Sequence, residues 1–363
     1  MPVTSATITT LRDQFPVLER LAYLNAGTDG PLASVAVRAA VEQLQAEVEH
    51  GRSREHFERR AELSTALREA YARALGCQSS DVALTTCTTD GLWVVIDGLD
   101  LLQGDEILTS DEEHPGLLGA LGAARELRGI AIRTAPFAEV HEAVGPLTRL
   151  VACSHVSWMT GRLAPAALAE LDVPVLLDGA QGVGAVPCDV RSLGCDAYAG
   201  AGQKWLCGPD GTGMLYVSES LRTKLRVSRR GYANLLDPDA GLDARLHEDA
   251  RRFDSAALSA ETLATALAAI EVLERAGWRA VHERARSLAS QLAEQLASIG
   301  RTLTPRDATT LVSFSSADPL AERTRLAEQG IVLRDIPGRP LLRASVGAWN
   351  DERDTQRLLA ALA

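Results

Sequence analysis

Apolar positions recur along this chain with two spacings, one helical and one typical of buried strands. Helical spacing fills residues 34–50, with Ser34 as the expected N-cap and Gly51 just past the end, and a second helix covers residues 53–75. Seven short apolar segments then alternate with helical ones: 82–86, 106–110, 130–134, 149–154, 174–178, 196–201 and 213–218. Strands that are apolar on both faces and alternate with helices are typical of a mostly parallel sheet covered on both sides. The pattern therefore predicts an α/β fold.

The pattern changes at about residue 258, where long amphipathic helices follow the buried strands. The expected elements are helices 259–276 and 278–299, strand 310–316, helix 319–329, strands 331–335 and 341–346, and a final helix from about residue 351. These elements indicate a second, smaller α+β domain. We assign residues 20–255 to the large domain, and residues 1–19 and 256–363 to the small one.

Composition excludes several classes of protein. The chain has 363 residues, 46% hydrophobic and 23% charged, which suits about two folded domains. Its net charge of −11 has the wrong sign for binding nucleic acid backbones, and no apolar run approaches the ~18 residues that span a bilayer. The first nineteen residues lack the apolar stretch of a signal peptide, so we expect a cytoplasmic protein. The six cysteines form no zinc-binding pattern, and we expect no metal.

Three segments place reactive side chains where α/β sheets bind ligands, beyond the carboxyl ends of the strands. Asp178 ends an apolar strand, and a carboxylate there can cap a helix, bind a metal or hold a cationic ring nitrogen. Lys204 lies among glycines and other small residues, where a buried amine loses its proton below its usual pKa and becomes a nucleophile. Cys87, Thr88 and Thr89 begin a helix after a strand and offer amides, hydroxyls and a positive dipole end to a phosphate.

A phosphate cradle, a strand-end aspartate and, 26 residues later, a glycine-flanked lysine together describe a pyridoxal phosphate site. The chain resembles the class V aminotransferase family of fold-type-I pyridoxal phosphate enzymes, which includes cysteine desulfurases, selenocysteine lyase, isopenicillin N epimerase-like proteins and cystine carbon-sulfur lyases. The resemblance runs from YLNAGTDGPL near residue 23 to RASVGAWNDERDTQRLL at the end of the chain. It is strongest to the cystine lyase-like branch, through CTTDGLW, GLDLLQGDEILTSDEEHPG, SHVSWMTG, DGAQGVGAVPCDV and GQKWLCGPDGTG.

The resemblance implies a fold and a set of cofactor contacts. The fold is a mostly parallel seven-stranded sheet between helices, with a smaller C-terminal α+β domain, in a homodimer whose active sites lie at the subunit interface. Lys204 is similar to the Schiff-base lysine, Asp178 to the partner of the pyridine nitrogen, and Gln181 to the neighbour of the phenolate oxygen. His114 resembles the imidazole that stacks on the cofactor ring. The helix start supplies the expected phosphate ligands: Cys87, Thr88 and Thr89.

Three residues are expected on the substrate side. Arg343 matches the family's arginine that grips the substrate carboxylate, for which its bidentate geometry is suited. Arg334, at the end of a strand in the small domain, is either a second substrate-side charge or part of a surface ion pair. Trp158 stands where desulfurases often have asparagine, and it is either a core residue or a wall of the substrate pocket.

The chain departs from the family pattern around the phosphate. Many desulfurases have Ser-x-His-Lys where this chain has Gln203 before its lysine, so that an amide replaces an imidazole. The family's threonine that reaches the partner subunit's phosphate falls near Ala257, which has no donor, and Ser255 or Ser259 is the expected substitute. A basic stretch is either a solvated surface or a contact for an anionic substrate or the phosphate: Arg222, Lys224, Arg226, Arg229 and Arg230.

The family's desulfurases carry a nucleophilic cysteine shortly before the carboxylate-binding arginine, and this chain has only DIPGRPLL between Arg334 and Arg343. We assign Cys207, near the lysine, to packing. We therefore expect carbon-sulfur β-elimination from a cysteine-derived amino acid, without a persulfide on the protein. Transamination or epimerisation on the same residues is the alternative, and a regulatory protein without catalysis is another. The expected partners are a small amino-acid substrate and a second copy of the chain, with neither nucleic acid nor membrane.

Overall fold

The large domain is built on a seven-stranded sheet. The computed structural model describes residues 11–255 and 258–363. The strands are β2 (Val82–Thr85), β3 (Glu106–Ser110), β4 (Ala131–Ala135), β5 (Thr148–Ser154), β6 (Val175–Asp178), β7 (Ala197–Ala201) and β8 (Gly213–Val217). They lie in the order β2-β8-β7-β6-β5-β3-β4, and β8 runs antiparallel to both of its neighbours while the other pairs are parallel. The predicted mostly parallel sheet is confirmed.

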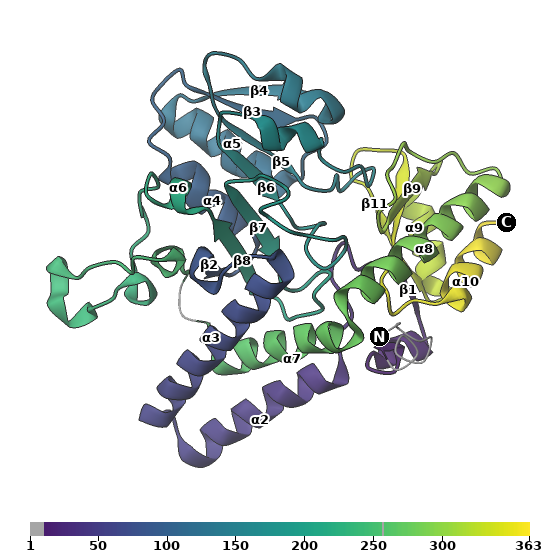
Figure 1. Ribbon diagram of the computed structural model, residues 1–363. Helices are drawn as coiled ribbons and strands as arrows, with labels where there is room; N and C mark the ends of the chain where they lie inside the picture. The colour runs from purple at the N-terminus through teal and green to yellow at the C-terminus, as the bar shows by residue number, and fades with distance from the viewer. Residues whose placement is uncertain (1–10, 256–257) are drawn as a thin grey trace.

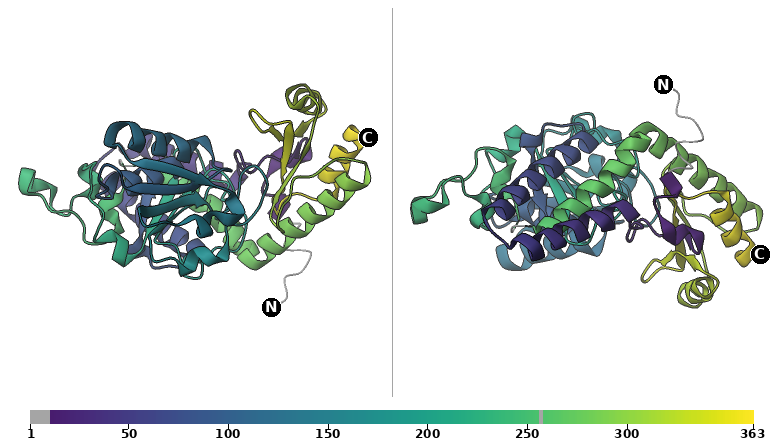
Figure 2. Two further views of the ribbon diagram at one scale, coloured as in Figure 1. Left: turned by 90° about the horizontal axis from the view of Figure 1, so that it is seen from above. Right: turned by 90° about the horizontal axis from the view of Figure 1, so that it is seen from below.

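Helices cover both faces of this sheet (Figure 1). On one face, α4 (Thr88–Gly98) contacts β6, β7 and β8, and α5 (Pro115–Arg128) packs beside it. On the other face lies α3 (Arg54–Leu75), with α2 (Ser34–His50) and α7 (Ala260–Ala276) alongside (Figure 2). Side chains from alternate strand positions enter two separate hydrophobic cores, one on each face. Burial on both faces explains why these strands are continuous apolar runs in the sequence.

Glycines close the first two long helices, at Gly51 as the sequence predicts and also at Gly76. Gly51 and Gly76 follow α2 and α3 with φ angles of 71° and 68°, which glycine adopts at least cost. The prediction that Ser34 caps α2 is wrong, because Ala33 occupies the N-cap position and Ser34 is already helical. The Ser34 amide donates to the Gln14 carbonyl (2.9 Å), so a contact from another segment fixes the helix start one residue earlier.

The C-terminal part forms the predicted smaller α+β unit. Its antiparallel sheet has the order β11-β12-β9. The strands and helices of this unit are β9 (Leu311–Ser315), β11 (Arg334–Asp335), β12 (Leu341–Ser345), α8 (Trp278–Ser298), α9 (Pro319–Glu328) and α10 (Glu352–Leu362). The helix α8 packs against β9 and α10, while α9 packs against β11 and β12. These contacts bury a third hydrophobic core.

The predicted strand 331–335 is two strands in different sheets. Its first half, β10 (Ile331–Val332), pairs in parallel with β1 (Ala22–Tyr23), whereas its second half, β11, pairs with β12. One apolar run in the sequence is therefore divided by a partner that comes from the other end of the chain. The pairing of β1 also ties the residues around 22 to the C-terminal unit. The assignment of residue ranges to two domains stays a prediction.

The remaining helical segments are short. They are α6 (Glu219–Arg222) and the 3₁₀ helices η1 (Pro16–Glu19), η2 (Ser79–Asp81), η3 (Phe137–Ala143), η4 (Ala166–Glu170), η5 (Tyr232–Asn234), η6 (Pro238–Asp243) and η7 (Ala250–Phe253). The segment around η6 forms an arm that projects from the body at the left of Figure 1, and a bridge between Leu235 and Leu246 closes it. In residues 11–255 and 258–363, no helix is long and apolar enough to cross a membrane.

Candidate active site

The carboxyl ends of β5 and β6 meet at one edge of the large sheet and carry the first candidate residue. Ser154 ends β5, Asp178 ends β6, and the two are partners in register. Asp178 is buried, and its Oδ1 accepts a hydrogen bond from the Ala180 amide (2.9 Å). Burial raises the pKa of the Asp178 carboxyl, and the nearby positive charge of Lys204 lowers it again. A cation beside Asp178 therefore favours its ionised form.

Lys204 follows β7 on a tight segment that brings its amine near Asp178. The Gly208 amide closes this segment by donating to the Gly202 carbonyl (2.9 Å). A Cβ atom on Gly30 would lie 2.0 Å from the Lys204 carbonyl oxygen, so only glycine lets the N-terminal segment pack there. Burial lowers the pKa of the Lys204 amine, while Asp178 raises it. The amine loses its proton more easily than a free lysine does, which a nucleophilic role requires.

His114 is the N-cap of α5 and lies opposite Trp158. Its Nδ1 accepts a hydrogen bond from the Gly116 amide (3.1 Å), and its ring meets the indole edge-on, with centroids 5.0 Å apart and planes at 84°. Burial, and then Lys204 and two nearby arginines, lower the pKa of His114 to about 4. The imidazole is therefore neutral at pH 7 and carries its proton on Nε2. A neutral ring held in this way can stack on a flat cofactor without adding charge.

Gln181 is held in one orientation by two hydrogen bonds. Its Nε2 donates to the Gly27 carbonyl (2.7 Å), and its Oε1 accepts from the Trp205 indole nitrogen (3.0 Å). The amide has a second N–H, which none of the hydrogen bonds of the described residues uses. This N–H can donate to an oxygen of a bound ligand, in agreement with the expected contact to the phenolate oxygen.

The start of α4 fits a phosphate group. Cys87 is the N-cap of this helix, and Thr88 and Thr89 form its first turn. The Thr88 hydroxyl and the side-chain oxygen of Gln203 are buried, and neither has a hydrogen-bond partner in the part of the chain that the structure describes. Thr89 lies against α5, since a Cβ atom on Gly116 would stand 2.6 Å from its hydroxyl. A buried, unpaired hydroxyl at a helix N-terminus suits an anion with several acceptor oxygens.

Two arginines from the small unit complete the candidate active site. Arg343 is fully buried on β12, and its Nη1 donates to the Trp158 carbonyl (2.8 Å). Burial, and then the neighbouring Arg334, lower the pKa of Arg343 to about 9. Arg334 is the register partner of Arg343 on β11, and its guanidinium carbon lies 5.6 Å from the centroid of the Trp158 indole ring. Positive charge therefore gathers on the small-unit side, where an anionic substrate group would be stabilised.

The turn that carries Trp158 joins the two parts of the molecule. Besides the bond from Arg343, the Ser313 hydroxyl donates to the Met159 carbonyl (2.5 Å), and the Thr309 hydroxyl donates to the Gly161 carbonyl (2.7 Å). The Trp158 side chain is only 6% exposed, and its indole N–H has no partner in the described residues. Trp158 is thus buried at the contact of the two units, between His114 and the arginines.

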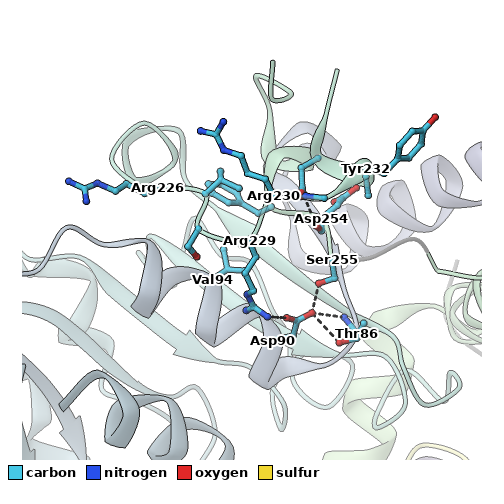
Figure 3. A pocket seen from close by; sticks show the side chains of 15 residues that line it. Thr86, Asp90, Val94, Arg226, Arg229, Arg230, Tyr232, Asp254 and Ser255 are labelled. Carbon is cyan, nitrogen blue, oxygen red and sulfur yellow. Dashed lines mark hydrogen bonds and ion pairs between the residues drawn. The ribbon is translucent and has the colours of Figure 1, made fainter. Parts of the chain in front are cut away.

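Three residues of the basic stretch, Arg226, Arg229 and Arg230, line a cavity of about 530 Å³ beside the first turn of α4 (Figure 3). Arg229 forms an ion pair with Asp90 (3.3 Å), and Arg226 forms one with Asp100 (2.5 Å). Away from this cavity, Arg222 forms an ion pair with Asp81 (3.1 Å). Ion pairs therefore neutralise part of the stretch, and Arg229 and Arg230 lie in the wall of the cavity beside the helix start that fits a phosphate.

The contact to a partner subunit's phosphate, expected from Ser255 or Ser259, stays a prediction. The Ser255 hydroxyl donates to Asp90 in the same chain, within the cavity of Figure 3. Ser259 is the N-cap of α7, where its hydroxyl accepts from the Thr262 amide (3.4 Å). Ala257 lies outside the described residues. Both serines therefore have a structural bond within their own chain.

Sequence reasoning missed the two glutamates that precede His114. Glu112 accepts hydrogen bonds from the Ser157 hydroxyl and from the Thr160 hydroxyl (2.6 Å), and so fixes the turn that carries Trp158. Glu113 is buried behind the site. Both glutamates lie in the loop directly after a strand end, where α/β sheets place their ligand-binding residues.

The chain matches one family over nearly its whole length. The model of the aminotransferase class-V family covers residues 23–358. The chain belongs to this family. It is an enzyme that depends on pyridoxal phosphate, and it has the fold-type-I architecture that the sequence predicts. The cofactor and fold expectations are confirmed.

Two solved structures of the protein C-DES are each 31% identical to this chain, with a TM-score of 0.91. One is a mutant with glycine covalently linked to its pyridoxal phosphate cofactor, and the match covers 97% of this chain and 98% of that chain. The other is a complex of the cystine C-S lyase C-DES with its reaction product cysteine persulfide. That match covers 96% of this chain and 99% of the C-DES chain. The isopenicillin N epimerase of Streptomyces clavuligerus is 30% identical over 334 residues, 81% of this chain and 82% of the epimerase.

Proposed function

We propose that this enzyme breaks the carbon-sulfur bond of a cysteine-derived amino acid by β-elimination. The observation that carries the proposal is Arg343, whose guanidinium is fully buried while its Nε and Nη2 have no partner among the described residues. A buried cation with two free donors needs a carboxylate ligand. The charge of Arg343 lowers the pKa of both Lys204 and His114, so both side chains lie near its guanidinium. An amino acid bound by its carboxylate to Arg343 then has its α-carbon near Lys204.

The residues around this space fit pyridoxal phosphate. Asp178 would hold the protonated ring nitrogen, Gln181 would donate to the phenolate oxygen, and Lys204 would form the covalent link. The phosphate would bind at the start of α4, through Thr88 and Thr89. When bound, the cofactor supplies an electron sink for the charge that develops at the α-carbon.

The chain's own residues then remove the α-proton of the substrate and hold its Cα–H bond in position. The neutral amine of Lys204 takes the proton from the α-carbon, and Arg343 keeps that C–H bond directed at Nζ by holding the carboxylate. The C–H electron pair forms the Cα–Cβ double bond, and the sulfur leaves with the pair of the broken Cβ–S bond. Trp158 and the neutral ring of His114 exclude water from this side.

The cysteines favour elimination over sulfur transfer to the protein. The connection between β11 and β12, directly before Arg343, has no cysteine in its sequence. Burial raises the pKa of five of the six thiols: Cys77, Cys153, Cys188, Cys195 and Cys207. A raised pKa keeps a thiol protonated and therefore a poor nucleophile. The proposal is supported by the similarity to C-DES, a cystine C-S lyase whose product is cysteine persulfide.

Product analysis tests the proposal. Purified enzyme is incubated with cystine, cysteine and common amino acids while pyruvate, sulfide, persulfide and keto acids are measured. We expect pyruvate and a low-molecular-weight sulfur product from the sulfur amino acids, and mass spectrometry should find the six cysteines unmodified after turnover. A stoichiometric persulfide on one cysteine, with lost activity in the matching Cys→Ala variant, would refute β-elimination and indicate a desulfurase.

Epimerisation is the second candidate, because isopenicillin N epimerase is 30% identical to this chain. It shares the removal of the α-proton and differs in returning a proton to the opposite face of the α-carbon. Deuterium from the solvent at an inverted α-carbon, without sulfur release, would identify it, and a keto acid without sulfur release would identify transamination. A cofactor absorbance that responds to no amino acid would support a regulatory protein.

A further inference from the structure

Glu113 is a buried carboxyl behind the site that the proposed reaction does not use. It lies in the turn after β3 and is only 5% exposed. Its Oε1 accepts from the Ser154 amide (3.1 Å) and from the Ser110 hydroxyl, and its Oε2 accepts from the Ser154 hydroxyl (2.6 Å). Ser110 ends β3 and Ser154 ends β5, so one side chain joins the ends of two neighbouring parallel strands.

The same carboxyl lies near Asp178. The register partner of Asp178 on β5 is Ser154, which Glu113 binds. The pKa of Cys153, one residue earlier on β5, is raised by burial and then by the charges of Glu113 and Asp178, so both carboxyls lie within reach of one thiol. The groups that face Glu113 are thus Ser110 from β3, Cys153 and Ser154 from β5, and Asp178 from β6.

Only one of these two carboxyls can carry a charge at low cost. Burial and the charge of Asp178 raise the pKa of Glu113 to about 7, although its three hydrogen bonds act in the opposite direction. The partners of Glu113 in the described residues are two hydroxyls and an amide, whereas Asp178 has the positive charge of Lys204 nearby. When two buried carboxyls lie close together, the one beside a positive charge loses its proton at the lower pH, and its negative charge then keeps the other carboxyl protonated.

We propose that Glu113 is a positioning residue that is a neutral acid at pH 6 while Asp178 carries the negative charge, and that it fixes the turn bearing His114. In the neutral acid, the protonated Oε2 donates to the Ser154 hydroxyl oxygen, and Oε1 still accepts from the Ser154 amide and the Ser110 hydroxyl. The pair then presents a single negative charge to the cofactor nitrogen. The bonds to both strand ends hold the turn, so that His114 stays opposite Trp158. The roles of Asp178 and His114 rest on the proposed function, but the test below measures Glu113 itself.

Infrared spectroscopy of the cofactor-loaded enzyme tests the protonation state, because a protonated carboxyl has a carbonyl stretch that a carboxylate lacks. At pH 6, the difference between wild type and Glu113→Gln should contain this acid band. The matched control is Glu112→Gln, which alters the adjacent glutamate bound to Ser157 and Thr160 and should keep the band. If Glu113→Gln removes no acid band, Glu113 is ionised and the proposal is overturned.

The coupling to Asp178 gives a second measurement that a purely structural glutamate would not affect. Asp178→Asn removes the neighbouring negative charge, so Glu113 should give up its proton more easily. The midpoint pH at which the Glu113 acid band disappears should therefore fall by about one pH unit, which is a tenfold change in proton affinity. An unchanged midpoint would overturn the coupling. The measurement needs no substrate, so a failure to release sulfur in the product analysis would leave its result standing.

Cofactor affinity tests the positioning role. Glu113→Gln keeps hydrogen-bonding groups for both serines, so its dissociation constant for pyridoxal phosphate should stay within about threefold of wild type. Glu113→Ala leaves the Ser154 amide unsatisfied and the turn unanchored, and it should bind the cofactor about tenfold more weakly. An alanine variant with wild-type affinity would overturn this part of the proposal.

Discussion

Lys204 and Asp178 show how burial and a neighbouring charge oppose each other in one site. Burial lowers the pKa of the lysine and raises that of the aspartate, while their attraction acts in the opposite direction on each. Arg343 adds another cation, which lowers the pKa of Lys204 further. The result is an amine that can act as a base beside a carboxylate that can hold a cation, the pair of properties that the proposed reaction needs.

Replacing Asp178 separates cofactor binding from catalysis. In Asp178→Asn, the side-chain oxygen still accepts from the Ala180 amide, so the fold and much of the bound cofactor should remain. Activity should fall by about 100-fold or more, because the amide carries no charge to hold the ring nitrogen protonated. Steady-state kinetics and cofactor absorbance measure the two effects. The control is Asp172→Asn, at an exposed aspartate just before the same strand, and a fully active Asp178→Asn would contradict the assignment.

Removing the guanidinium of Arg343 should weaken substrate binding and the alignment of the α-proton. We expect Arg343→Ala to lower kcat/KM by a factor that corresponds to about 2 to 5 kcal/mol, as for one lost partner of a buried charge pair. Arg339→Ala changes an exposed arginine on the connection between β11 and β12 and should leave kcat/KM close to wild type. Equal values for the two variants would mean that the carboxylate binds elsewhere.

The residues that end strands could be predicted from the sequence, whereas their partners could not. Asp178 and Lys204 stand out because an apolar strand or a glycine-rich segment precedes each of them. The two bonds of Gln181, to Gly27 and Trp205, join segments far apart in the chain, and no local pattern indicates them. The burial of Glu113 depends in the same way on where two other strands end.

At the scale of elements, the seven strands of the large sheet could be predicted to within about a residue or two. Parallel strands buried on both faces are continuous apolar runs, and such runs need no knowledge of the partner strand. The segment 331–335 was predicted as one strand but forms two, because its first half pairs with β1 and its second half pairs with β12. Pairing of this kind depends on tertiary contacts, which also explains the one-residue error at Ser34.

A buried histidine at the sheet edge should make stability depend on pH. His155 follows β5, and its Nδ1 lies 3.0 Å from the Tyr198 hydroxyl on β7. Burial lowers the pKa of His155 to about 4, from an ordinary value of 6.5, so the unfolded chain binds more protons between these values. Stability that is present above pH 6.5 is therefore lost as the pH falls towards 4.

Urea unfolding at pH 7 and pH 5 measures this effect. The contribution of His155 should fall by roughly 2 kcal/mol between the two, and His155→Gln should reduce the pH dependence by that amount. His50→Gln, at a histidine whose side chain is 69% exposed, should leave the dependence unchanged. The same pH dependence in His155→Gln and wild type would show that this histidine does not drive it.

At the scale of the whole molecule, the site is shared between two units. Asp178 ends β6 and Lys204 follows β7 in the large domain, whereas Arg343 belongs to the small unit. The turn around Trp158 is bonded to Glu112 of the large domain and to Arg343 of the small unit. Substrate carboxylate and cofactor would therefore be held by different units, and the alignment of the α-proton depends on how those units pack. Hydrogen bonds from Thr309 and Ser313 to the turn hold that arrangement.

The outer face of α2 leads to the last prediction, a homodimer. Four apolar side chains at helical spacing are exposed there by between 45% and 87%: Val37, Val41, Leu44 and Val48. The helix packs on α7 with another face, and in Figures 1 and 2 it lies at the outside of the molecule. A row of this kind on a folded protein marks an interaction surface, and the family resemblance predicts a second copy as the partner.

A charge in the middle of this row should break the dimer. We expect wild type to have the mass of a dimer by light scattering, and Val41→Glu to shift to monomer because the carboxylate would be buried without a partner. Leu127→Glu places the same charge at a more exposed apolar position on α5, where 82% of the leucine is accessible against 45% of Val41, and should stay dimeric. A monomeric wild type would contradict the dimer itself. A dimeric Val41→Glu would show that the subunits meet through a different face.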